Sequence, residues 1–149
     1  METKITTTIE RKDVNMSATA LHQLTLDTIE QCIDYAKLKN WVITDKSDST
    51  PAEQSERMRI GLQNASKNQR KRIGVAIFRI QKKPTMRKIN LFFHHIKKLS
   101  GGTIDISFAP SLAEQKSLAL RKQYLAAKAE MERIYAEYTK AKKEAYGKQ

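Results

Sequence analysis

The chain has 149 residues, of which 28 are Lys or Arg and 16 are Asp or Glu, so its formal net charge is +12. The single cysteine, Cys32, has no partner for an internal disulfide, and no apolar run approaches the length of a membrane span. The N-terminus lacks the basic end and apolar block of a secretory signal. We therefore expect an intracellular protein, in the cytoplasm, the nucleus or a virion interior, that is neither secreted nor bound to a membrane.

The N-terminal third predicts one helix between less regular segments. Residues 1–12 alternate weakly and favour an edge strand or a loose arm. Ser17 is a candidate N-cap for an acidic helix over residues 17–40. A short apolar run follows at 41–43, and the polar residues 44–50 are typical of an exposed loop.

A second helix is predicted to begin at Thr50, because Thr50, Pro51 and Glu53 have the order of an N-cap, a first-turn proline and a capping box. We expect it to weaken around residues 64–69. The next segment, residues 73–80, is ambiguous, since its β-branched content favours a buried strand while its apolar spacing also fits a helix. Of the two, we predict a strand.

The clearest amphipathic helix is predicted over residues 86–100, where Gly101 and Gly102 can end it. Residues 103–108 alternate apolar and polar side chains, which predicts a strand with one solvated face.

Residues 111–146 predict one long helix that Gly147 can end. Small and apolar side chains recur along it at alternating spacings of three and four, which is a heptad seam. The seam is weak, because Ala and Tyr replace many of the Leu and Ile residues of a strong dimer. Either the helix packs against its own domain or it binds another chain, and we favour oligomerisation or docking through Leu120, Tyr124, Met131, Ile134 and Tyr138.

Together these elements predict a helix-dominated α+β fold. A compact basic domain with a few short strands is expected over residues 1–110, followed by the long helix within residues 111–149. The charge is concentrated in the segment 57–110, which has 13 Lys and Arg and one acidic residue, Asp105. A charge surplus that only kept the protein soluble would be spread more evenly, so this segment predicts a surface that binds a polyanion.

The sequence has none of the common phosphate-loop, zinc-ligand or nucleophile motifs of enzymes. We therefore predict no enzymatic activity, no cofactor and no metal. His94 and His95 are adjacent, so on a helix they point about 100° apart and cannot chelate one ion. Asp27, Glu30 and Asp34 share one side of a predicted helix, and we interpret them as a solvated face rather than a divalent-ion site.

We predict that the polyanion is nucleic acid, DNA or RNA, bound with weak sequence specificity through its phosphates. The residues expected to make the main contacts are Arg70, Lys71, Arg72, Lys82, Lys83, Arg87, Lys88, Lys97 and Lys98. The rival prediction is a structural or assembly component of a virion or large complex, whose basic middle and long helix both bind protein partners.

Two geometries for nucleic-acid binding depend on the ambiguous segment. If residues 73–82 are helical, residues 83–85 form the turn of a helix-turn-helix and the following helix reads base edges. The side chains then expected at the bases are Thr85, Arg87, Lys88 and Asn90. If the segment is a strand, residues 73–108 form a parallel strand–helix–strand unit whose exposed helix face contacts phosphates.

Overall fold

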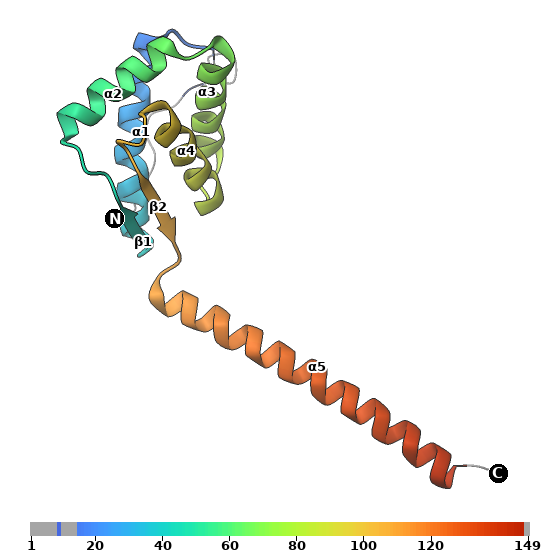
Figure 1. Ribbon diagram of the computed structural model, residues 1–149. Coiled ribbons are helices and arrows are strands. Elements are labelled where there is room, and N and C mark those ends of the chain that lie inside the picture. Colours follow the sequence, from blue (N-terminus) through green and yellow to red (C-terminus); the bar gives the residue numbers. More distant parts are fainter. Residues whose placement is uncertain (1–8, 10–14, 148–149) are drawn as a thin grey trace. The chain divides into compact units, whose positions relative to one another are not determined.

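The structure is a computed structural model that describes Ile9 and residues 15–147 (Figure 1). Apart from Ile9, the arm or strand predicted over residues 1–12 lies outside the described residues. The chain divides into two compact units, residues 1–110 and 111–149. No helix in the described part of the chain is long and apolar enough to cross a membrane.

The described residues form five helices and one two-stranded antiparallel sheet, which confirms the helix-dominated α+β fold. The elements of the first unit are α1 (Ala18–Leu38), β1 (Val42–Asp45), α2 (Pro51–Asn64), α3 (Lys67–Lys82), α4 (Met86–Leu99) and β2 (Ile106–Ala109). The second unit contains α5 (Leu112–Tyr146).

Each helix of the first unit begins at a Ser or Thr that acts as an N-cap. Its hydroxyl accepts a hydrogen bond from a backbone N–H in the first turn, which satisfies a donor that the helix itself leaves free. The four caps are Ser17, Thr50, Ser66 and Thr85. The predicted starts at Ser17 and Thr50 are thus confirmed, and so is the predicted helix at 86–100.

The strand predicted at 73–80 is wrong, because these residues lie inside α3. Ser66 and Gln69 form a reciprocal capping box that starts the helix before the ambiguous segment. Ile73, Ile77 and Ile80 then fall on the buried face of α3. Tertiary packing has overridden the weak β preference of the β-branched residues. The parallel strand–helix–strand geometry is therefore wrong as well.

The sheet joins two distant segments of the chain. β1 and β2 pair antiparallel, with Val42 opposite Ala109 and Asp45 opposite Ile106. A strand is confirmed in the region predicted at 103–108, although β2 spans Ile106–Ala109 and so begins three residues later than expected. β1 extends the apolar run at 41–43 into the first two residues of the predicted loop.

The core of the first unit lies between the helices and one face of the sheet. α1 packs against α2, α3 and β1, while α4 packs against α2, α3 and β2. Gly61 lies where α2 meets the end of α4, and a Cβ added to it would come within 2.0 Å of the Leu99 carbonyl oxygen. A glycine at this position therefore permits a close approach that any side chain would prevent.

α5 is the long helix that the sequence predicted. The Ser111 hydroxyl accepts a hydrogen bond from the Glu114 N–H at its start, and Gly147 follows its last turn. Every residue from Leu112 to Tyr146 is exposed. The apolar side chains of its seam therefore face solvent in a single chain.

Candidate nucleic-acid interface

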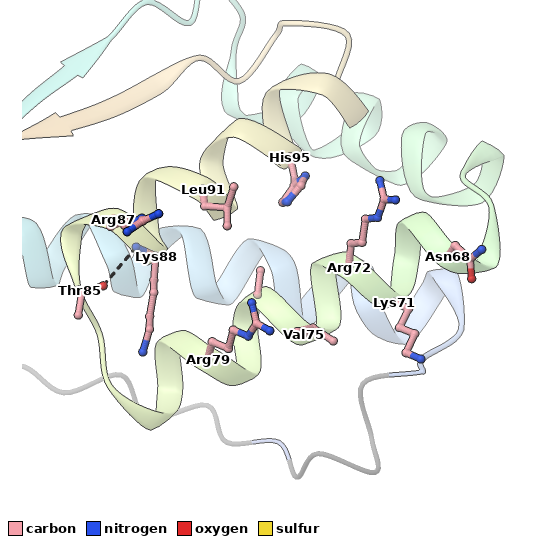
Figure 2. Close-up of a pocket in the computed structure, with 11 residues that line it drawn as sticks. Asn68, Lys71, Arg72, Val75, Arg79, Thr85, Arg87, Lys88, Leu91 and His95 are labelled. Carbon is pink, nitrogen blue, oxygen red and sulfur yellow. Dashed lines mark hydrogen bonds between the residues drawn. The ribbon is translucent and has the colours of Figure 1, made fainter.

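A groove of about 890 Å³ lies between α3 and α4 (Figure 2). We call it the α3–α4 groove. It is lined by Asn68, Lys71, Arg72, Val75, Ala76, Arg79, Thr85, Arg87, Lys88, Leu91 and His95.

Helical periodicity brings these side chains together. On α3, Arg72 and Arg79 are seven residues apart, two turns along the same face. On α4, Arg87, Leu91 and His95 recur every four residues. Figure 2 shows Arg72 extending from α3 toward α4, where His95 points back toward α3. The turn at residues 83–85 reverses the chain and lets two separate basic faces form one surface.

The groove is positively charged, and none of its charges is balanced locally. Five of its lining residues are Lys or Arg, and none is Asp or Glu. Within the described part of the chain, none of these five cations forms an ion pair with a carboxylate. Like charges held this close repel one another, so an anionic ligand would relieve an unfavourable interaction as it bound.

The ionisation of His95 reflects this potential. Burial lowers the pKa of its imidazole, and the neighbouring positive groups His94, Arg72 and Lys98 lower it further. The ring therefore prefers its neutral form when the groove is empty. A bound anion would favour the protonated ring.

The groove also has an apolar component. Val75 and Ala76 of α3 and Leu91 of α4 lie among the cations, and Leu91 is 48% exposed. A ligand that fits this surface combines negative charge with apolar parts. A nucleotide chain has both, in its phosphates and in the faces of its sugars and bases.

Four of the nine residues predicted to contact phosphates line the groove, namely Lys71, Arg72, Arg87 and Lys88. The other five lie elsewhere. The Arg70 guanidinium donates a hydrogen bond to the Ala65 carbonyl oxygen at 2.8 Å, and Lys97 forms an ion pair with Asp105 at 3.4 Å. Lys82 lies over the ring of Phe78.

Lys83 and Lys98 complete the set. Lys83 is the C-cap of α3, and its carbonyl oxygen accepts a hydrogen bond from the Lys88 ammonium at 3.1 Å. Lys98 lines a smaller hollow beside Arg57 and Gly101. Both side chains are exposed, so they add to the positive potential of the first unit without lining the groove.

Residues 73–82 are helical, and α3, a three-residue turn and α4 follow one another in the order that the helical alternative expected. Of the four side chains expected at base edges, however, two have structural roles. The Asn90 side chain donates to the Phe108 carbonyl oxygen at 3.0 Å and accepts from the Phe108 N–H at 2.9 Å, so it binds β2 to α4. Thr85 caps α4. Arg87 and Lys88 line the groove.

The sequence analysis did not include two ionisable residues of the groove, Arg79 and His95, among the expected contacts. Arg79 lies within the segment that was predicted as a strand. In a strand, a separation of seven residues from Arg72 does not place the two side chains on one face. A helix over residues 73–82 would have placed Arg72, Val75 and Arg79 on one face. For His95 the sequence offered no such signal, because only the position of α3 brings it into the groove.

Metal and nucleophile chemistry find no support in the described part of the chain, where no three His, Cys, Asp or Glu side chains gather as metal ligands would. In the acidic stripe of α1, Asp27 accepts a hydrogen bond from the Gln23 side chain at 2.9 Å. Cys32 is buried, and burial raises the pKa of its thiol to about 12. A thiol of this kind is a core residue rather than a nucleophile.

The five residues predicted for oligomerisation or docking are all exposed on α5: Leu120, Tyr124, Met131, Ile134 and Tyr138. Comparison of the chain with known protein families, with curated proteins and with solved structures found no significant match.

Proposed function

We propose that this protein is a non-enzymatic nucleic-acid-binding or nucleoprotein-packaging protein, which binds phosphates in the α3–α4 groove and self-associates through α5. The observation that carries the proposal is the gathering of five cations along one groove whose lining contains no carboxylate, with no ion pair to any of the five within the described residues. Such a site binds a linear polyanion better than a compact anion, because its charges are spread along two helices.

The spacing of the charges suits a nucleotide chain. Arg72 and Arg79 are separated by about 10.5 Å of helix rise, at 1.5 Å per residue. One strand of a duplex advances about 3.4 Å per phosphate, so this distance corresponds to roughly three nucleotide steps. Phosphate contacts of this kind carry no sequence information directly, which supports weak sequence specificity.

The test is fluorescence anisotropy of labelled single- and double-stranded DNA and RNA, titrated with the full chain over a salt series. If all five groove cations contact phosphates, log K should fall against log salt with a slope of about −4.5 for duplex DNA or about −3.5 for a single strand. The polymer with the highest affinity then identifies the ligand.

A pair of charge-matched variants separates groove contacts from general attraction. Arg72→Gln with Arg79→Gln removes two groove cations, and the salt slope should become shallower by about 1.8 on duplex DNA. Lys37→Gln with Lys46→Gln removes the same charge from exposed positions outside the groove, and it should change the slope far less. Equal effects of the two variants, or no binding at low salt, would refute the groove as the binding site.

The alternative function is a structural or assembly component of a virion or large complex. The exposure of the whole apolar stripe of α5 favours it. In that case the chain should bind no nucleic acid at low salt, the Arg72 and Arg79 variant should still assemble, and polar residues in place of Leu120, Met131 and Ile134 should abolish assembly.

A further inference from the structure

α5 presents an apolar stripe that has the geometry of a coiled-coil seam. Ser117, Tyr124, Met131, Tyr138 and Ala145 occupy one heptad position, and Leu120, Ala127, Ile134 and Ala141 occupy the other. All of these residues are exposed. A stripe that follows this repeat is complementary to another helix that carries the same repeat, because the side chains of one fill the holes of the other.

We propose that the partner is the α5 helix of a second copy of this chain, paired antiparallel about a two-fold axis between Ala127 and Met131. This inference specifies the partner and the geometry of the self-association in the proposed function, and it rests on that part of it. Its consequence is that the two globular units of a dimer are attached at opposite ends of the paired helices.

The sizes of the seam residues favour the antiparallel orientation. A parallel pair would place each residue against its own copy, so that thin layers of Ala127 or Ala141 would alternate with thick layers of Tyr124 or Tyr138. Helices at a constant distance cannot pack both kinds of layer well.

In the antiparallel pair each layer instead combines two different residues. Tyr138 faces Leu120 of the second copy, Tyr124 faces its Ile134, and Met131 faces its Ala127. The bulky residues are thereby distributed evenly along the middle of the interface.

The charges beside the seam favour the same orientation and fix its register. With the axis between Ala127 and Met131, Lys116 faces Glu144 of the second copy, and Arg121 faces its Tyr135. Each of these contacts occurs twice by symmetry. A parallel pair would instead place Lys116 against Arg121.

Other antiparallel registers are less favourable. A shift by one heptad in either direction would place Arg121 against Lys142 or Lys128 of the second copy. In the proposed register, Lys128 and Glu130 each meet their own copy once, at the axis. Arg133 reduces the repulsion between the two Glu130 side chains, because it already forms ion pairs with Glu130 and Glu137 of its own helix.

The dimer would present two α3–α4 grooves, joined through helices that are each about 52 Å long at 1.5 Å per residue. Two grooves attached at opposite ends of the paired helices suit the bridging of separate segments of a polyanion. Sites at the same end of a parallel pair would suit binding to one segment.

Disulfide cross-linking of the full chain under mild oxidation tests the orientation. Leu120→Cys mixed with Tyr138→Cys should give a cross-linked dimer, whereas Leu120→Cys alone should give none. The unsubstituted chain is the control, since its Cys32 is buried. Cross-linking of Leu120→Cys to itself would show a parallel pair and overturn the proposal.

A second measurement avoids changes to the seam. Spin labels on Lys143→Cys, which lies on the outer face of α5, should be separated by about 42 Å along the axis in the antiparallel dimer. A separation under about 25 Å, roughly two helix diameters, would indicate the parallel pair. Light scattering that gives the mass of one chain at high protein concentration would overturn the dimer and the proposed self-association. Nucleic-acid binding by the groove would then stand or fall on the anisotropy experiment alone.

Discussion

His95 would make the proposed binding of a polyanion in the α3–α4 groove depend on pH. Its burial and the positive groups around it lower its pKa, so the ring is largely neutral near pH 7 when the groove is empty. A polyanion interacts more favourably with the protonated ring. Binding should therefore raise the pKa of His95, and affinity should increase as the pH falls below the pKa of the bound state.

We expect an NMR titration of the imidazole signals to give His95 a pKa below 6.5 in the free protein and a higher pKa with a saturating oligonucleotide. His95→Gln should weaken the dependence of affinity on pH between about 5 and 7. His94→Gln at the exposed neighbouring position should keep the dependence of affinity on pH, although the loss of the His94 imidazole would itself raise the pKa of His95. An unchanged pKa of His95 on binding would contradict its place beside the ligand.

The same pKa shift affects the stability of the free protein. Because the unfolded chain binds the proton first as the pH falls below 6.5, His95 lowers the free energy of unfolding from that pH down to its folded-state pKa. Binding and stability thus respond to acid in opposite directions at this residue.

Asn90 connects α4 to the sheet through both atoms of its side-chain amide. Asn90→Ala would leave the N–H and the carbonyl of Phe108 without these partners, and we expect it to lower the free energy of unfolding by about 2–3 kcal/mol. Chemical denaturation measures this loss. Asn68→Ala, at an exposed position of the groove, should cost much less. If Asn90→Ala instead weakened binding while stability was unchanged, the residue would be a base contact after all.

At the scale of whole elements, the starts of helices and the long periodic patterns could be predicted from the sequence. α4 and α5 combine a Ser or Thr cap with an uninterrupted helical repeat, so the local signals agree. α3 could not be assigned in the same way, because its isoleucines and valine suit either structure. The capping box at Ser66 and Gln69 resolves the choice, and it lies ahead of the segment that was ambiguous.

The groove could be predicted only in part for a related reason. The high density of basic residues predicted a surface for a polyanion, and Arg72 and Arg87 of that prediction line the groove. Which cations face one another depends on the antiparallel return of α4 along α3, a tertiary feature with no local signature. Arg70 and Lys97 show the limit of charge counting, since each has an intramolecular partner.

The close approach of α2 and α4 leaves no room for a side chain at Gly61. An ordinary Gly→Ala change inside a helix would stabilise it by about 1 kcal/mol through helix propensity. Here the new methyl group would meet the Leu99 carbonyl oxygen, so α2 and α4 would have to separate.

We expect Gly61→Ala to lower the free energy of unfolding by about 1–3 kcal/mol in spite of its better propensity. Thermal or chemical unfolding measures the change, and Gln63→Ala at an exposed position of the same helix is the control. A rise in stability would mean that the close approach of the two helices is not essential.

On the scale of the whole molecule, the buried core and the proposed self-association belong to different units. The buried residues of the described chain all lie before Pro110, and α5 contributes none. The folding of the first unit should therefore not depend on the long helix.

We expect a chain that ends at Pro110 to unfold at the same temperature as the full chain. It should bind a short oligonucleotide with unchanged single-site affinity, and it should lose any gain in affinity for a long polymer, because that gain requires two linked grooves. Calorimetry and anisotropy with short and long ligands measure both effects. An unfolded or strongly destabilised fragment would contradict this separation of roles.

The pairing of β1 with β2 also has a consequence for the order of folding. The two strands come from segments that enclose α2, α3 and α4, so their hydrogen bonds close a long loop. Closing such a loop costs conformational entropy, and the hydrogen bonds of a short two-stranded sheet do not offset that cost by themselves. We therefore expect the helices between the strands to collapse first and shorten the distance. The sheet should then be the last part of the globular unit to form, on a helical core that has already assembled.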